Sequence, residues 1–108
     1  MGIELKIQPL RYVLAVWEEG SFHGAARQLH RSQPALSMAI RDLEERLGQP
    51  LFEKNLKGQL TPFGEYCLPR FRELVKQHDR LANELQHVAE GQQGRVTLAT
   101  VPSVASRL

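Results

Sequence analysis

Residues 20–48 read GSFHGAARQLHRSQPALSMAIRDLEERLG, and this stretch decides the fold of the chain. Its pattern predicts two helices joined by a three-residue turn. From residue 21 to residue 41 there is no aspartate or glutamate. The same segment contains three arginines and two histidines: Arg27, Arg31, Arg41, His23 and His30. A solvated helical face normally mixes both signs of charge, so this segment is expected to attract an anion.

Residues that favour helix ends define the two helices. Gly20 tolerates the left-handed conformation that ends a helix, and the Ser21 hydroxyl can cap the next one. Ser32 can cap the second helix of the pair, with Pro34 tolerated in its first turn, and Gly48 ends it. The inner side of the first helix is expected to carry Ala25, Ala26 and Leu29. The apolar stripe of the second helix is expected to be Leu36, Ile40, Leu43 and Leu47.

The other face of the second helix carries the candidate base contacts. At 100° per residue, Pro34, Ser37, Met38 and Arg41 cluster away from the apolar stripe, and Gln33 lies at the exposed N-terminal end. Glutamine pairs well with adenine and arginine with guanine in the major groove of DNA, and apolar side chains contact the thymine methyl group. These side chains are therefore predicted to read base edges. The alternative is that they simply form a solvated face, with Met38 a tolerated surface residue.

Contacts to the DNA backbone are expected from a second set of residues, which carry no sequence information themselves. The set comprises Ser21, Arg31, Ser32, Lys54 and Lys57. The two serines are helix caps first of all, and a phosphate contact would be an additional role.

Apolar spacing predicts the elements around this pair. Leu10, Val13, Leu14 and Trp17 recur at helical spacing after Pro9, so a helix is expected to end at Gly20. Trp17 and Phe22 are expected in the core. Residues 51–54 and 57–60 read as a small two-stranded wing.

A long helix is expected to begin at Thr61-Pro62. Its apolar residues follow the heptad spacing of a helix that packs along another helix. The expected seam consists of Phe71, Leu74, His78, Leu81, Leu85 and Val88. His78 is expected as a partly buried seam residue, with a pH or register switch as the alternative. Residues 91–94 read as a hinge, and residues 96–99 alternate like a strand that lacks a partner in the remaining sequence.

Bulk properties narrow the function classes. The 108 residues carry a formal net charge of +2, so the placement of charge matters more than its total. The lone Cys67 excludes a disulfide framework, fits a reducing cytosol, and is expected to be buried. The N-terminus does not resemble a signal peptide, and no apolar run approaches the length of a membrane span. No nucleophile–base set, Gly-rich phosphate loop or Cys/His cluster occurs, so neither an enzyme nor a metal site is expected.

The ordered motifs resemble the N-terminal part of a LysR-type transcriptional regulator. The matching strings are Gly20-Ser21-Phe22, Ala25-Ala26-x-x-Leu29-His30, Ser32-Gln33-Pro34-Ala35-Leu36-Ser37, Leu43-Glu44-x-x-Leu47-Gly48, Leu51-Phe52-Glu53 and Leu60-Thr61-Pro62-x-Gly64. The resemblance implies a mainly helical chain with three parts. These are a winged helix-turn-helix DNA-binding domain at residues 1–61, a linker helix for dimerisation at residues 62–91, and a hinge with the first strand of an incomplete α/β effector-binding domain at residues 92–108.

The same resemblance implies the partners. The expected partner is double-stranded DNA with an interrupted dyad, bound by a dimer formed through the linker helix, and the full-length protein is expected to form tetramers. A small-molecule effector is expected for the full-length protein and no cofactor for this fragment, which is expected to be cytoplasmic, in a bacterial nucleoid. The chain departs from the family pattern at Lys54 and Lys57, where arginine is frequent, and at Met38, where a polar or basic residue is common. The competing hypothesis is a helical interaction module without specific DNA binding.

Overall fold

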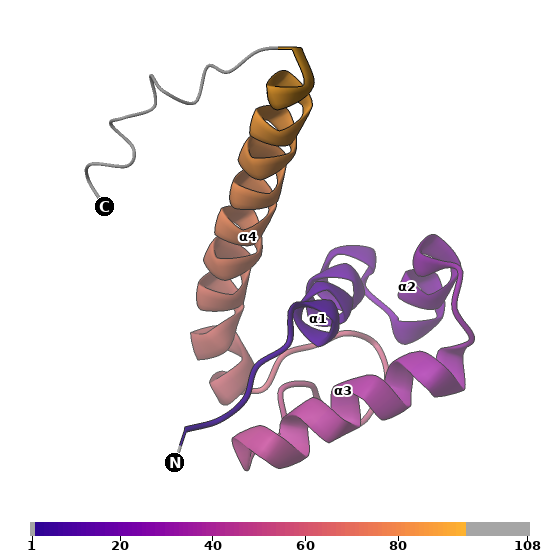
Figure 1. Cartoon of the computed structure of the whole chain (residues 1–108). Helices are drawn as coiled ribbons and strands as arrows, with labels where there is room; N and C mark the ends of the chain where they lie inside the picture. The colour runs from indigo at the N-terminus through magenta and orange to yellow at the C-terminus, as the bar shows by residue number, and fades with distance from the viewer. Residues whose placement is uncertain (1, 95–108) are drawn as a thin grey trace. The chain divides into compact units, whose positions relative to one another are not determined.

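The computed structural model describes residues 2–94, which contain four helices (Figure 1). They are α1 (Ile7–Glu19), α2 (Phe22–Leu29), α3 (Gln33–Leu47) and α4 (Pro62–Gly94). The chain divides into two compact units, one up to Val75 and one from Lys76 onward. Helices α1, α2 and α3 all contact one another within the first unit, which also holds the start of α4.

The helix ends predicted at Gly20, Ser21, Ser32 and Gly48 are confirmed. Gly20 ends α1 in the left-handed conformation (φ 78°), and its N–H donates to the carbonyl oxygen of Val16 at 2.9 Å. The Ser21 and Ser32 hydroxyls cap α2 and α3, accepting hydrogen bonds from Gly24 N at 2.9 Å and Ala35 N at 3.2 Å. Gly48 ends α3 with φ 85°. These local rules orient α2 and α3 as a helix-turn-helix pair.

The core of the first unit is built from one face of each helix together with the segment that follows α3. The most deeply buried side chains are Leu10, Val13, Val16, Leu36, Ile40 and Leu51. Phe22 is buried as expected, and its ring meets Phe52 edge-to-face, with ring centroids 5.4 Å apart. Cys67 is also buried. Because α3 has its apolar stripe inside, its opposite face points outward.

Trp17 was expected in the core, and this prediction is wrong. The indole is 40% exposed, and the guanidinium of Arg72 lies over it, 5.0 Å from the ring centroid. Other residues of α1 face inward, among them Tyr12 and Ala15, so the buried face is centred away from Trp17. The tryptophan instead lies at the edge of the core, where a cation can contact its face.

The wing is a loop with little strand structure, contrary to the two strands expected at residues 51–54 and 57–60. Within the described residues the two segments share one isolated antiparallel bridge, between Phe52 and Leu60. Leu56 (φ 61°) and Gly58 (φ 75°) both adopt the left-handed conformation. Paired strands require an extended backbone, and two left-handed residues so close together bend the chain out of that geometry.

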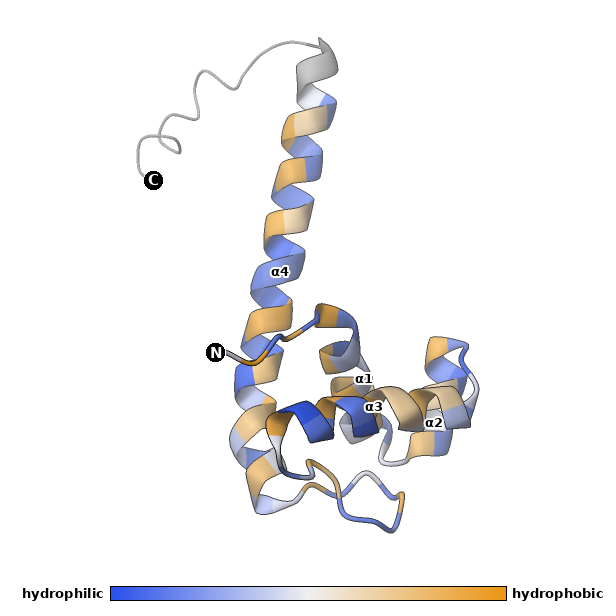
Figure 2. Cartoon of the chain, turned by 60° about the horizontal axis from the view of Figure 1, so that its bottom comes forward, coloured by the Kyte–Doolittle hydropathy of each residue, from blue (hydrophilic) through white to orange (hydrophobic). Residues whose placement is uncertain are grey.

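Helix α4 continues to Gly94, so residues 91–94, which were expected to form a hinge, are helical. An isolated glycine in a helix costs only about 1 kcal/mol relative to alanine, which the surrounding helix-favouring residues can offset. Hydrophobic residues recur as separate bands along α4 (Figure 2). The strand predicted at residues 96–99 lies outside the described residues.

Candidate nucleic-acid interface

The outward face of α3 carries all five predicted base contacts. Pro34, Met38 and Arg41 are exposed, with Met38 at 59%, whereas Gln33 and Ser37 are half-buried. On the opposite face Leu36, Ile40 and Leu43 are at most 3% exposed. The segregation of the two faces therefore follows the helical spacing of the sequence.

The N-terminal end of α3 favours an anionic partner. No acidic residue lies in its first turn. Pro34 has no N–H, and the N–H groups of Ala35 and Leu36 donate to the hydroxyl and carbonyl oxygens of Ser32, so Gln33 supplies the N–H that an anion can meet there. The aligned peptide dipoles give such a helix start a partial positive charge. Phosphate groups of DNA would be stabilised at this position.

The residues predicted to contact the DNA backbone lie around this face. Arg31 and Ser32 are exposed in the turn, and Lys54 and Lys57 are exposed on the wing. The Arg31 guanidinium lies over the ring of Tyr12, 5.6 Å from its centroid. This cation–π contact holds the Arg31 side chain against the protein surface. Ser21 is half-buried as the cap of α2.

The wing partly covers the start of α2. The N–H of Phe22 donates to the carbonyl oxygen of Leu56 at 3.3 Å, so this N–H is used by the wing. Any phosphate near Ser21 would therefore meet fewer free N–H groups than the sequence suggests. The same hydrogen bond holds the wing beside the helix-turn-helix pair.

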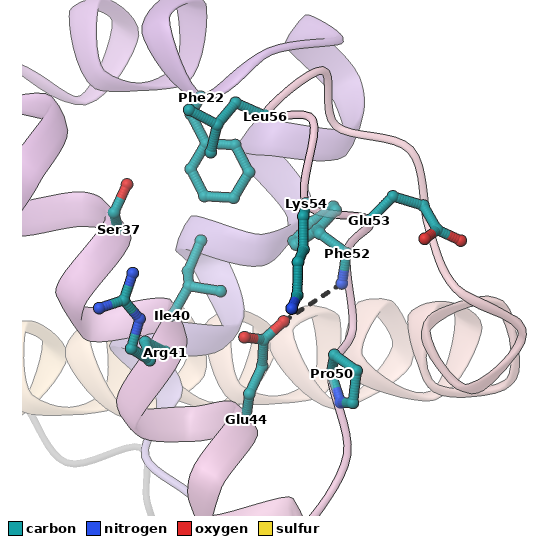
Figure 3. A pocket seen from close by; sticks show the side chains of 10 residues that line it. All are labelled: Phe22, Ser37, Ile40, Arg41, Glu44, Pro50, Phe52, Glu53, Lys54 and Leu56. Atoms are coloured by element: carbon teal, nitrogen blue, oxygen red, sulfur yellow. Dashed lines mark hydrogen bonds between the residues drawn. The ribbon is translucent and has the colours of Figure 1, made fainter.

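A groove of 330 Å³ separates α3 from the wing (Figure 3). Ser37, Arg41 and Glu44 line it from α3, and Phe52 and Lys54 line it from the wing. Its lining also includes Phe22, Ile40, Pro50, Glu53 and Leu56. The groove thus brings predicted base-reading residues of α3 together with one predicted backbone-contacting lysine of the wing.

Sequence reasoning missed the role of Glu44. Its Oε2 accepts hydrogen bonds from the N–H groups of Leu51 at 2.7 Å and Phe52 at 3.2 Å. The available signal was helical spacing, because Glu44 lies three residues after Arg41 and seven after Ser37, on the same face. Its backbone partners could not be found from side-chain patterns.

The predicted seam residues of α4 divide between two environments. Phe71 is 6% exposed and belongs to the core of the first unit, so it is already covered within one chain. The apolar residues farther along the seam are exposed: Leu74, Leu81, Leu85 and Val88. His78 is exposed, and its Nδ1 lies 3.2 Å from a carboxylate oxygen of Asp79.

Other kinds of site find no support among the described residues. No three His, Cys, Asp or Glu side chains within them are grouped as a metal site requires. None of the helices in this part of the chain is long and apolar enough to cross a membrane.

Burial raises the pKa of the Cys67 thiol, and the positive charge of Arg70 offsets part of that rise.

The helix-turn-helix pair, the exposed polar face in the N-terminal half of α3 and the adjacent wing define a DNA-binding domain of transcription regulators. Residues 7–65 match the sequence model of the family described as "Bacterial regulatory helix-turn-helix protein, lysR family". The chain belongs to this family.

Relatives and solved structures agree with this assignment. The small neutral protease regulatory protein of Streptomyces coelicolor is 36% identical over 104 residues, which cover 95% of this chain and 32% of that protein. The HTH-type transcriptional regulator PunR of Escherichia coli K12 is 38% identical over 91 residues, which cover 83% of this chain and 29% of PunR. The chain therefore spans about a third of the length of these relatives.

Two similar structures are complexes with DNA. The BenM DNA-binding domain bound to catB site 1 DNA has a TM-score of 0.74 and 35% identity, covering 82% of this chain and 96% of that chain. The CbnR DNA-binding domain bound to DNA has a TM-score of 0.71 and 31% identity, covering 79% of this chain and 99% of that chain.

Proposed function

We propose that this chain binds double-stranded DNA with sequence specificity, with α3 in the major groove and the wing on the backbone and the adjacent minor groove. The single observation that carries the proposal is the outward face of α3, which combines polar and cationic side chains in a segment free of acidic residues from 21 to 41. A helix of this width fits the major groove, and its N-terminal turns then meet the base edges.

Each predicted contact has a chemical role in this proposal. Gln33 pairs with adenine N6 and N7, and Arg41 reaches guanine O6 and N7 or a phosphate. Ser37 is small enough to allow close approach, and Pro34 and Met38 contact thymine methyl groups. Lysine is a point charge with no planar fork, so Lys54 and Lys57 contact phosphates rather than read a narrow minor groove.

The second part of the proposal is a homodimer formed through α4. Leu81, Leu85 and Val88 are exposed at heptad spacing, which leaves an apolar stripe without a partner in one chain. Two DNA-binding units in one dimer would recognise an interrupted dyad, because a two-fold axis in the protein requires two half-sites. By family resemblance, the full-length protein would form tetramers and bind a small-molecule effector through a further domain, as a cytoplasmic regulator associated with the nucleoid. The chain is proposed to act by binding alone, without catalysis.

The competing function is a helical interaction module, which the exposed stripe of α4 favours. Arg41→Glu separates the two hypotheses. Under our proposal this variant loses DNA binding and keeps its sedimentation coefficient, because Arg41 lies on α3 and the stripe lies on α4. Arg46→Glu is the matched control, since it makes the same change of charge on the same helix, at a side chain 45% exposed. Equal DNA binding by wild type and Arg41→Glu would contradict the proposal.

A further inference from the structure

Glu44 is a carboxylate that lines the groove between α3 and the wing (Figure 3). Negative charge in this groove repels the phosphates of DNA, so the residue needs another explanation. Its oxygen Oε2 accepts two hydrogen bonds from consecutive backbone N–H groups, Leu51 at 2.7 Å and Phe52 at 3.2 Å. Hydrogen bonds to an ionised acceptor are stronger than those between neutral groups.

The two residues that Glu44 holds form the base of the wing. The side chains of Leu51 and Phe52 are 0% and 5% exposed, so their N–H groups lie close to the core. Without a partner, such N–H groups are unfavourable in the folded state. Because Glu44 also belongs to α3, its carboxylate connects the proposed recognition helix to the wing.

Two further backbone hydrogen bonds hold the wing at other points. Leu56 O accepts from Phe22 N at 3.3 Å at the start of α2, and Thr61 N donates to Leu51 O at 2.9 Å. Neither hydrogen bond involves α3. The carboxylate of Glu44 therefore joins α3, through these two hydrogen bonds, to the segment that leads into Lys54 and Lys57.

We propose that Glu44 is a positioning residue for DNA binding. Its carboxylate fixes the base of the wing against α3, so that Lys54 and Lys57 reach the DNA backbone while Arg41 and Ser37 lie in the major groove. This inference rests on the proposed DNA-binding function, and it assigns an acidic side chain a role in binding a polyanion.

The test compares Glu44→Ala, Glu44→Gln and Glu45→Ala by fluorescence anisotropy on one DNA duplex at several salt concentrations. Glu45 is the matched control, because it is the exposed neighbour on the same helix and loses the same charge. Removing a charge alone should leave binding unchanged or tighten it. Glu44→Ala should weaken binding about tenfold and reduce the salt slope by about 1–2, since each phosphate contact contributes about 0.9. Glu44→Gln keeps an oxygen acceptor and should retain most of the affinity and the slope.

Two further measurements exclude a general loss of structure. In a Lys54→Ala/Lys57→Ala background, Glu44→Ala should cause little additional loss, because the contacts it positions are already absent. Amide hydrogen exchange at Leu51 and Phe52, measured without DNA, should accelerate in Glu44→Ala and not in Glu45→Ala. An unchanged salt slope in Glu44→Ala, or tighter binding as in the Glu45 control, would overturn the inference. Loss of discrimination at one base pair with an unchanged slope would also overturn it, since that result identifies a base reader. Failure of the wild type to bind any duplex would instead refute the proposed function.

Discussion

Gly58 in the wing lies against the carbonyl oxygen of Val16 near the end of α1, and a Cβ at this position would come within 2.9 Å of that oxygen. It would also meet the backbone of Gly20 and Ser21 at 3.0 Å and 3.2 Å. Gly58 has φ 75°, in the left-handed region. The wing can therefore pack on the junction between α1 and α2 only because position 58 has no side chain.

Gly58→Ala is expected to destabilise the first unit by about 2–4 kcal/mol, combining the strain of the left-handed conformation with the steric overlap against backbone. Gly48→Ala is the matched control, because Gly48 has φ 85° and open space around it. It should cost only about 1–2 kcal/mol. Urea unfolding followed by circular dichroism measures both values. Equal losses for the two variants would show that the close approach to Val16 has no energetic effect.

Met38→Ala is expected to reduce affinity for a duplex with thymine at the contacted position by about 0.8 kcal/mol or more, as one or more buried methyl-sized groups are lost. Replacing that thymine by uracil removes the methyl group and should weaken wild-type binding but not Met38→Ala binding. Leu56→Ala is the control, because Leu56 is an exposed apolar side chain (49%) on the wing. If thymine-to-uracil substitution has the same effect on wild type and Met38→Ala at every position, Met38 does not contact a methyl group.

Leu85→Glu should abolish dimerisation and leave the first unit folded, because Leu85 is 57% exposed within a single chain and a charge opposes burial between helices. Asn83→Glu introduces the same charge at a heptad position opposite the stripe and should still dimerise. Sedimentation velocity at tens of micromolar reports both results. A wild-type monomer under these conditions would contradict the proposed dimer of this chain.

The buried Cys67 thiol is expected to make stability depend on alkaline pH. Because burial raises its pKa in the folded state, the folded chain holds the thiol proton at a pH where the unfolded chain releases it. The contribution of the buried thiol to the free energy of unfolding is fully present below the pKa of the unfolded thiol, about 8.5. It is lost as the pH rises above that value and through the higher pKa of the folded chain. The free energy of unfolding of wild type, minus that of Cys67→Ala, should therefore fall above about pH 8.5. A constant difference would show that the pKa of the thiol is not raised.

Local chemistry explains which features were predictable from the sequence. The ends of α1, α2 and α3 depend on glycines and serines within one turn of each end, so reading neighbouring residues was sufficient. The exposure of Met38 and Arg41 followed from helical spacing alone. The roles of these residues in binding DNA remain predictions, as do those of the seam residues beyond Phe71.

The errors arose where distant parts of the chain meet. Trp17 has apolar spacing, but its environment is set by Arg72 on α4, far along the sequence. Residues 51–54 and 57–60 were predicted as two strands of a wing, whereas the left-handed residues Leu56 and Gly58 limit them to one bridge. The role of Glu44 in holding the wing was not predicted, because its partners are backbone N–H groups, which every sequence contains.

The central claim is specific recognition of DNA by this chain. Fluorescence anisotropy with a duplex carrying an interrupted T…A dyad, and with a scrambled duplex of equal length, at two salt concentrations tests it most directly. We expect the chain to bind the dyad more tightly, with affinity falling steeply as salt rises because phosphate contacts release counterions. Equal affinity for both duplexes would contradict sequence recognition, and no binding at low salt would contradict DNA binding by this chain.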